Sequence, residues 1–396
     1  MANMLPAKLR VERQKPFRRG PMIGSGFSAC LWIALLLFLL PGHRALADVF
    51  RFYVGTMTDK SMSKGIYLGS IDTDTGKLGM LGLAAVAKNP NFLALSPDNK
   101  LLFAALDSTV GSFKVQSDGT LNPLNEQPSG GGAPCHVCLD ETGHSLFVAN
   151  YNGGNIASFE VDPEGMIGER AALMQFTGSG PNPKRQKQSC AHSVYVDPKN
   201  KFVYSCDLGS DSVWIFKVDA LHAGLAPSDP PVAKVPPGSG PRHLAFHPGG
   251  KFVYAANEMG FSVTVFARDA ASGALTALET VPTLLPGTPT KGSTAAEICC
   301  HPSGKWLYVS NRGTDVISVF TIASDGRLTL VQNAPSVAKF PRCFAVDPTG
   351  QWLIVAGQKD NRIAVLKIDQ ATGLLTATDQ TAAVGAPVCV LFVPRK

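Results

Sequence analysis

The sequence is short of charge, of aromatic side chains and of any long apolar segment. Charged residues make up 17% and aromatic residues 8% of its 396 residues. Its longest apolar run, ACLWIALLLFLL, has about twelve residues, whereas a membrane-spanning helix needs about twenty. No long helical pattern follows residue 48, and GSGP occurs only ahead of strand patterns, not of a helix. These absences argue against a membrane-spanning helix and against a nucleotide-binding fold.

The N-terminal 47 residues have the features of an export signal. A basic stretch precedes the apolar run, and Ala45–Ala47 forms a small-residue cleavage site before Asp48. Either Met1 or Met22 fits as the start of this signal. We therefore expect residues 1–47 to be a signal peptide and the mature protein to be periplasmic or secreted. No membrane anchor is expected after cleavage.

The basic excess of the chain lies in this predicted signal. Residues 1–47 carry seven Lys or Arg and one Glu, which accounts for the whole formal net charge of +6. The remaining 349 residues hold 29 basic and 29 acidic side chains. They have no basic surface of the kind that binds nucleic acid, so no nucleic-acid partner is expected.

Eight cysteines follow the predicted cleavage site. An oxidising compartment would allow some of them to pair, but the sequence does not give the connectivity. The CHVC stretch at 135–138 has the spacing of a redox or zinc motif. It lies in an alternating strand pattern, however, where residues three apart point to opposite faces. We expect small buried cysteines here and neither a metal ion nor another cofactor.

A unit of about fifty residues recurs along the chain after residue 48. Each unit has a short apolar strand, a turn of the D/H-P-x-G type, a second β-rich strand such as FVYAAN, and a third strand such as SVTVFARD. Six units are complete, and the two chain ends supply the parts of a seventh. The pattern predicts an all-β, seven-bladed β-propeller over residues 48–396, a single domain closed by pairing of its N- and C-terminal strands. A closed ring favours a monomer.

Polar residues recur at two positions of this unit. In a propeller, the start of the first strand and the end of the second lie at the same mouth of the central channel, and the sequence GPRHLAFHPGGKFVYAANE places Arg242, His243 and Glu258 at these positions. Charged groups gathered at an apolar rim are costly unless they are paired or functional. Ion pairs that join neighbouring blades, and a histidine spacer at His243, are the structural alternatives.

The segments GPNPKRQ…CAHSVYVDP, GSGPRHLAFHP, AAEI..HPSGKWLYVSNRG and FPR.FAVDPTG resemble those of the seven-bladed propeller lactonase family. This family contains bacterial 6-phosphogluconolactonases and fungal carboxy-cis,cis-muconate lactonizing enzymes. The resemblance runs from about residue 50 to the C-terminus. It implies that His192, Arg242, Glu258 and Arg312 act on the lactone. Cys190, Cys299 and Cys343 depart from the family pattern.

Lactone opening needs an activated water and a stabilised oxyanion, which these residue types supply. His192 or Glu258 is the candidate general base, and Arg242 and Arg312 are candidate electrostatic clamps. Eight further residues are expected to orient or bind the substrate: Arg185, Asp207, His243, Asn257, Glu297, Asn311, Arg342 and His136. The sequence thus predicts an exported lactonase that hydrolyses a sugar-type lactone, as the 6-phosphogluconolactonases do.

Two other functions stay open from the sequence. A muconate-type cycloisomerase would share the fold and the same four residues, and fold analogy alone does not separate it from a hydrolase. A non-catalytic propeller that binds a ligand or a protein is the second alternative. It would not need arginine and histidine gathered at one mouth.

Overall fold

A computed structural model describes residues 48–59 and 61–395 of the chain; the expected signal peptide at 1–47 lies outside them. Twenty-eight strands form seven four-stranded antiparallel sheets, and the described part contains no α-helix. It therefore also holds no helix that is long and apolar enough to cross a membrane.

Six of the sheets are each built from four consecutive strands. The first three are β4 (Phe92–Leu95), β5 (Leu101–Ala105), β6 (Thr109–Val115) and β7 (Leu121–Pro128); β8 (Pro134–Leu139), β9 (Ser145–Asn150), β10 (Asn155–Val161) and β11 (Ile167–Gln175); and β12 (Ala191–Val196), β13 (Phe202–Asp207), β14 (Ser212–Asp219) and β15 (Gly224–Lys234). The next three are β16 (Pro241–Phe246), β17 (Phe252–Asn257), β18 (Ser262–Arg268) and β19 (Leu275–Pro282); β20 (Thr294–Cys300), β21 (Trp306–Arg312), β22 (Val316–Ile322) and β23 (Leu328–Pro335); and β24 (Pro341–Val346), β25 (Trp352–Gly357), β26 (Arg362–Ile368) and β27 (Leu375–Ala383).

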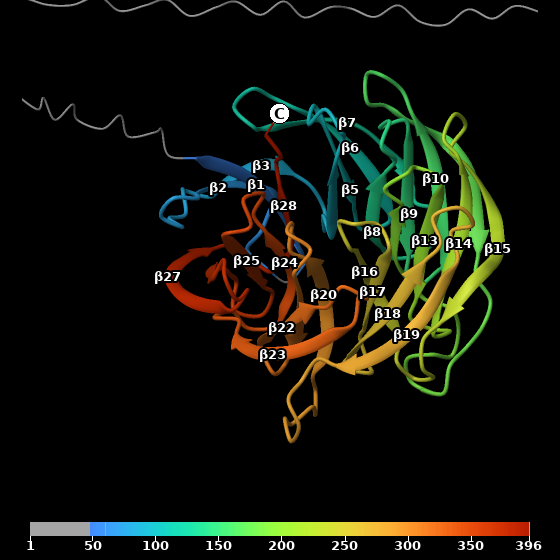
Figure 1. Cartoon of the computed structure of the whole chain (residues 1–396). Coiled ribbons are helices and arrows are strands. Elements are labelled where there is room, and N and C mark those ends of the chain that lie inside the picture. The colour runs from blue at the N-terminus through green and yellow to red at the C-terminus, as the bar shows by residue number, and fades with distance from the viewer. Residues whose placement is uncertain (1–47, 60, 396) are drawn as a thin grey trace, which may run out of the picture. The chain divides into compact units, whose positions relative to one another are not determined.

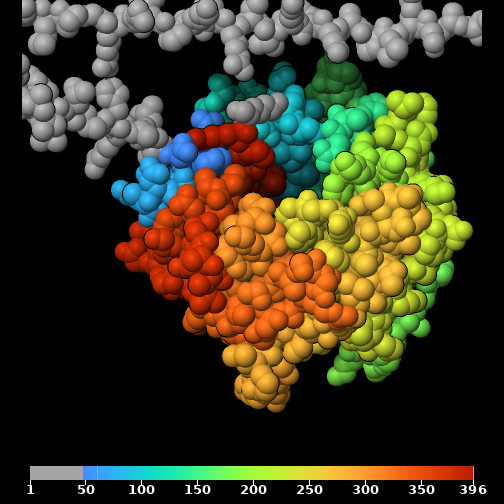
Figure 2. Space-filling model, in the orientation of Figure 1, coloured from blue at the N-terminus to red at the C-terminus, as the bar shows by residue number. Residues whose placement is uncertain are grey.

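The seventh sheet joins the two ends of the described chain. Its order is β28-β1-β2-β3, with β28 at Pro387–Phe392, β1 at Val49–Thr56, β2 at Gly65–Asp72 and β3 at Gly82–Val86. Strand β28 pairs antiparallel with β1, so that Phe52 lies opposite Phe392 and Val54 opposite Val390. The blue β1 and the red β28 lie side by side in Figure 1, and Figure 2 shows blue and red residues in contact at this seam. The predicted seven-bladed propeller and its closure are confirmed.

The burial of each strand follows its place in the blade. The second strands β9, β13 and β25 are buried along their whole length, whereas outer strands such as β19 and β27 are half-buried or exposed after their first residue. This agrees with apolar, β-branched runs in the middle of a blade and mixed polar and apolar runs at its rim. Apolar side chains of neighbouring blades share each core; Tyr204 and Val213 of one blade pack with Leu244 and Val253 of the next.

A repeated tyrosine joins neighbouring blades. The Tyr204 hydroxyl donates a hydrogen bond of 2.7 Å to the carbonyl oxygen of Gly273 in the next blade, and Tyr254 and Tyr308 make the same contact with Gly326 and Gly373. Gly273 has a φ of 78° and lies against the Phe202 ring, where a Cβ would come within 2.6 Å of it. The turn that receives the tyrosine therefore requires glycine.

All eight cysteines of the described residues are unpaired. Cys135, Cys190, Cys206, Cys343 and Cys389 are buried, and Cys138, Cys299 and Cys300 are half-buried. Burial raises the pKa of Cys135, Cys138, Cys206 and Cys299. Most of these thiols therefore behave as small, protonated core side chains.

Candidate active site

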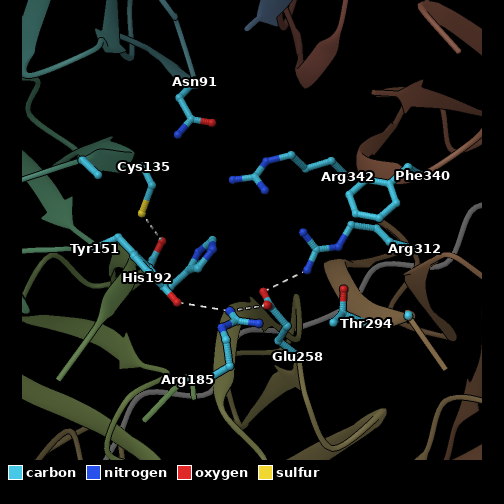
Figure 3. Close-up of a pocket in the computed structure, with 12 residues that line it drawn as sticks. Asn91, Cys135, Tyr151, Arg185, His192, Glu258, Thr294, Arg312, Phe340 and Arg342 are labelled. Atoms are coloured by element: carbon cyan, nitrogen blue, oxygen red, sulfur yellow. Dashed lines mark hydrogen bonds and ion pairs between the residues drawn. The ribbon is translucent and has the colours of Figure 1, made fainter. Parts of the chain in front are cut away.

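A cavity of about 420 Å³ opens where several first strands begin and several second strands end. Figure 3 shows its polar side chains converging on one space from different blades. The cavity is lined by Asn91, Ala133, Cys135, Tyr151, Arg185, His192, Glu258, Gly292, Thr294, Arg312, Phe340 and Arg342.

Four of the blades present a residue of the site through the same backbone irregularity: Cys135 lies in a slip between Pro134 and His136, and the other three slips hold site residues that the sequence predicted. The pairing between first and second strands slips between Ala191 and Ser193, between Pro241 and His243, and between Pro341 and Cys343. The residue inside each slip is His192, Arg242 and Arg342, respectively. A bulge releases one residue from the strict alternation of a strand and re-aims its side chain. It explains how consecutive residues such as Arg242 and His243 both point to the inside of the ring.

Glu258, directly after β17, is the charged centre of the site. Its Oε1 accepts a hydrogen bond of 2.7 Å from Arg185 Nη2, and its Oε2 lies 2.9 Å from Arg312 Nη2 and 3.3 Å from Arg242 Nε. Burial alone would raise the pKa of Glu258, but the three guanidinium groups outweigh it and lower the pKa to about 2. The side chain is therefore a carboxylate at all physiological pH values.

The four arginines of the site differ in their access to the cavity. Arg242 is only 2% exposed and lies behind Glu258, outside the cavity lining. Arg185, from the loop between β11 and β12, reaches Glu258 and also donates to the Tyr151 hydroxyl at 3.1 Å. Arg312 lies over the Phe340 ring, 5.3 Å from its centroid. Among the described residues, Arg342 has no ion-pair partner, although it lines the cavity.

His192 brings an uncharged imidazole to the same cavity. Burial lowers its pKa well below the usual 6.5, and the positive charges of the neighbouring arginines lower it further. Its Nδ1 is buried without a protein hydrogen-bond partner, while its ring lines the cavity. A neutral imidazole beside a water-accessible cavity can accept a proton.

The cavity as a whole combines a proton acceptor with positive charge. Three guanidinium groups contact one carboxylate and a fourth, that of Arg342, is unpaired in the described part of the chain, so the site is positive and suited to a carbonyl oxygen or an anionic group. Within residues 48–59 and 61–395, no group of three or more His, Cys, Asp or Glu side chains is arranged to hold a metal ion.

Comparisons with known proteins agree with this geometry. Residues 51–392 match the family model described as lactonase, 7-bladed beta-propeller. The chain belongs to the seven-bladed β-propeller lactonase family. It is 35% identical to a 6-phosphogluconolactonase of Formosa agariphila over 83% of this chain and 95% of that protein. A 6-phosphogluconolactonase of Bacillus subtilis is 32% identical over 86% of this chain and 97% of its own length.

A solved structure of a relative is also similar. The Pseudomonas aeruginosa periplasmic gluconolactonase superposes with a TM-score of 0.82 at 29% identity, covering 88% of this chain and 99% of that one. The similarity thus extends over nearly the whole propeller. The family resemblance inferred from the sequence motifs is confirmed.

In this lactonase-family protein, five of the twelve predicted site residues line the cavity: His192, Glu258, Arg312, Arg185 and Arg342. Arg242 contacts them from behind Glu258. The other six, which were expected to bind or orient the substrate, lie outside the lining: His136, His243, Glu297, Asp207, Asn257 and Asn311.

Asp207 and Asn257 end the second strands β13 and β17, Asn311 is the last residue but one of β21, and all three are fully buried. Asp207 Oδ1 accepts hydrogen bonds from the backbone N–H groups of Cys190 and Gly209. Asn257 donates to the Ser262 hydroxyl at 3.0 Å, and Asn311 accepts from Thr283 at 2.7 Å. Their polar atoms are thus bound by other groups of the protein.

Seven residues of the cavity wall are not among the predicted site residues. Tyr151 and Phe340 are the clearest cases, and Asn91, Cys135, Thr294, Ala133 and Gly292 complete the set. Tyr151 directly follows the polar end of β9, and Phe340 directly precedes the Pro341–Arg342 pair. Tyr151 thus occupies the position that Glu258 has in its own blade, so the repeat itself offered this signal, whereas Phe340 lies outside the two repeated positions.

Proposed function

We propose that this protein is an exported lactonase that hydrolyses a sugar-type lactone at one mouth of the propeller channel. The observation that carries this proposal is the cavity that combines neutral His192 with Arg312, Arg342 and the Arg185–Glu258 pair. The 6-phosphogluconolactonase relatives support lactone hydrolysis, and the periplasmic gluconolactonase relative supports export.

His192 is the general base in this mechanism. Glu258, with its pKa near 2 and three guanidinium partners, is a poor proton acceptor, whereas the His192 imidazole is uncharged. His192 takes a proton from a water molecule, whose oxygen attacks the lactone carbonyl carbon. The carbonyl π electrons move to the oxygen, and Arg312 stabilises the resulting oxyanion, while Arg342 binds an anionic group of the substrate.

Collapse of the tetrahedral intermediate completes the reaction. The carbonyl re-forms, the bond to the ring oxygen breaks, and the His192 imidazolium returns its proton to that leaving oxygen. Water and lactone together give the open hydroxy acid. Glu258 and Arg242 keep the neighbouring guanidinium groups fixed, so that little reorganisation is needed in the transition state.

The test is hydrolysis of 6-phosphogluconolactone and gluconolactone, with a cis,cis-muconate as the cycloisomerase substrate. We expect the wild-type protein to hydrolyse a sugar lactone and His192→Ala to lower kcat by a hundredfold or so, the usual contribution of general-base catalysis. His222→Ala, at the exposed turn between β14 and β15, is the matched control and should keep full activity. Turnover of the muconate alone, or equal turnover by His192→Ala, would reject the proposal.

Export is tested by expressing the full chain in a bacterial host and separating periplasm, medium and cytoplasm. Mass spectrometry of the exported protein should give an N-terminus at Asp48. An intact N-terminus in the cytoplasmic fraction alone would contradict this part of the proposal.

A further inference from the structure

A polar cluster extends from His192 into the protein interior, and its other members lie outside the lining of the cavity. We call it the histidine cluster and define it as His136, His192, His243 and Glu297. The ring centroids of His192 and of His136 each lie 5.2 Å from that of His243. The Phe92 ring stacks on His136 at 4.0 Å. The cluster is therefore enclosed by protein, where hydrogen bonds are strong and unpaired polar atoms are costly.

The protonation of two of these imidazoles follows from their contacts. His243 Nδ1 lies 2.9 Å from Glu297 Oε1. Because burial lowers the pKa of His243 to about 4, the ring is neutral, and its Nδ1–H donates to the carboxylate. Its Nε2 is then a bare lone pair. The Val194 backbone N–H donates to His136 Nδ1 at 3.4 Å, which leaves the His136 proton on Nε2.

With these assignments, the buried ring nitrogens that lack a protein partner among the described residues comprise one donor, one acceptor and one atom that can be either. His136 Nε2 is a donor, His243 Nε2 is an acceptor, and His192 Nδ1 takes either role; none of the three has a protein partner. Glu297 Oε2 and Ser193 Oγ are also buried without one. Buried polar atoms in native proteins are almost always hydrogen-bonded, often through an internal water.

One water molecule satisfies this set. Its two lone pairs accept the protons of His136 Nε2 and His192 Nδ1, and one of its hydrogens is donated to His243 Nε2. The second hydrogen is left for another buried acceptor, and Ser193 Oγ is one without a protein partner. Three or four hydrogen bonds to buried polar atoms are what an ordered internal water typically makes.

We propose that Glu297 and His243 are positioning residues, which hold His192 in its Nδ1–H tautomer through a bridging buried water. The Nε2 lone pair of His192 is then directed to the cavity. This inference rests on the proposed function only in taking His192 as the base. The tautomer itself is a property of the resting protein and is measurable without any substrate.

The first test is NMR of the full-length protein labelled with ¹³C and ¹⁵N at histidine, with His192→Ala used to assign the His192 signals. We expect His192 as the Nδ1–H tautomer in the wild-type protein. Glu297→Leu and His243→Phe remove the acceptors and should shift His192 towards Nε2–H. Glu297→Gln keeps an acceptor oxygen and should preserve the tautomer, a rescue that a simple packing role would not require. Glu279→Leu, on the outer strand β19, is the control and should change nothing.

The second test is kinetic. Glu297→Leu should lower kcat about tenfold or more with KM unchanged within about twofold, because the base is misoriented while binding is kept. In a His192→Ala background, the same substitution should have no further effect on kcat. An equal loss in both backgrounds would show a structural role and overturn the inference, as would an Nε2–H His192 in the wild-type protein. A protein without lactone hydrolysis would count against the proposed function, while the NMR result would still decide the tautomer.

Discussion

Two blades of the propeller carry the same local motif and use it differently. The blade of β16–β19 begins with Pro241–Arg242 and that of β24–β27 with Pro341–Arg342, and both have the bulge at the arginine. In both, the residue after the second strand donates its N–H to the residue before the proline: Glu258 to Gly240 at 2.7 Å and Gln358 to Phe340 at 3.3 Å. Yet Arg242 is buried against a carboxylate, and Arg342 faces the cavity without one.

The difference between these blades is the side chain that follows the second strand. Glu258 neutralises Arg242 and also binds arginines from two other parts of the chain. Gln358 carries no charge, so Arg342 keeps its positive charge available to the cavity. Burial and the charge of Arg242 lower the pKa of Arg342. A bound anion would stabilise the charged guanidinium and raise this pKa again. The same motif thus places one arginine against a carboxylate and leaves the other, within the described residues, unpaired at the cavity, where we expect it to bind an anionic group of the substrate.

Removing the carboxylate of Glu258 should have the largest effect. Glu258→Gln leaves three guanidinium groups without their shared partner, two of them buried. We expect kcat/KM to fall a hundredfold or more and the free energy of unfolding to fall by about 3 to 5 kcal/mol. Urea unfolding and lactone hydrolysis measure the two effects. Glu279→Gln, which removes an outer carboxylate paired with Arg327, is the matched control, and an equal effect there would contradict the central role of Glu258.

The two equivalent arginines should separate binding from stability. Arg342→Gln should raise KM for a phosphorylated lactone about tenfold, because a charge-assisted contact to the substrate is lost. Its effect on KM for neutral gluconolactone and on the melting temperature should be small. Arg242→Gln should instead lower the melting temperature by several degrees, because the buried Glu258 loses a partner.

Steady-state kinetics on both lactones and thermal unfolding of both variants provide the comparison. If Arg342→Gln and Arg242→Gln changed KM and melting temperature alike, the division of roles between the blades would be wrong.

The sequence predicted the ring but not the roles within it. The fifty-residue period and the alternating strands determine the seven blades, because each blade buries its apolar side chains against its neighbours. The same period correctly brought His192, Glu258, Arg312 and Arg342 to one cavity. It did not reveal that Arg242 and Glu297 lie outside the cavity lining, because that depends on bulges and on partners from other blades. Strand alternation alone assigns only one face to each residue.

The position after the arginine also differs, with His243 in one blade and Cys343 in the other. His243 is neutral in the folded protein, with a pKa of about 4 against 6.5 when exposed. Its contribution to stability is therefore complete above pH 6.5 and is lost as the pH falls from about 6.5 to about 4. Charged or titratable groups that influence it are Arg242, Glu297 and Arg342, with His136 and Tyr195 in ring contact.

The measurement is the free energy of unfolding in urea between pH 7.5 and 4.5. The wild-type protein should lose a few kcal/mol over this range, at about 1.4 kcal/mol per unit of pKa shift. His243→Gln should show a shallower slope. The contribution of Glu258 has a different window, since its folded pKa of about 2 affects stability only below about pH 4.5. An unchanged slope in His243→Gln would show that other histidines carry the acid sensitivity.

The smallest expected effect comes from making the two blades alike. Gln358→Glu places a carboxylate at the position equivalent to Glu258, after a strand with the same register. A carboxylate there would compete with the substrate anion for Arg342, so KM for a phosphorylated lactone should rise about threefold, with KM for the neutral lactone and kcat unchanged. Addition of Arg342→Gln to this variant should then raise KM less than it does in the wild-type protein, because the carboxylate has already weakened the same contact. Full additivity of the two substitutions would mean that position 358 does not act on Arg342, and the contrast between Glu258 and Gln358 would not explain the different roles of the two arginines.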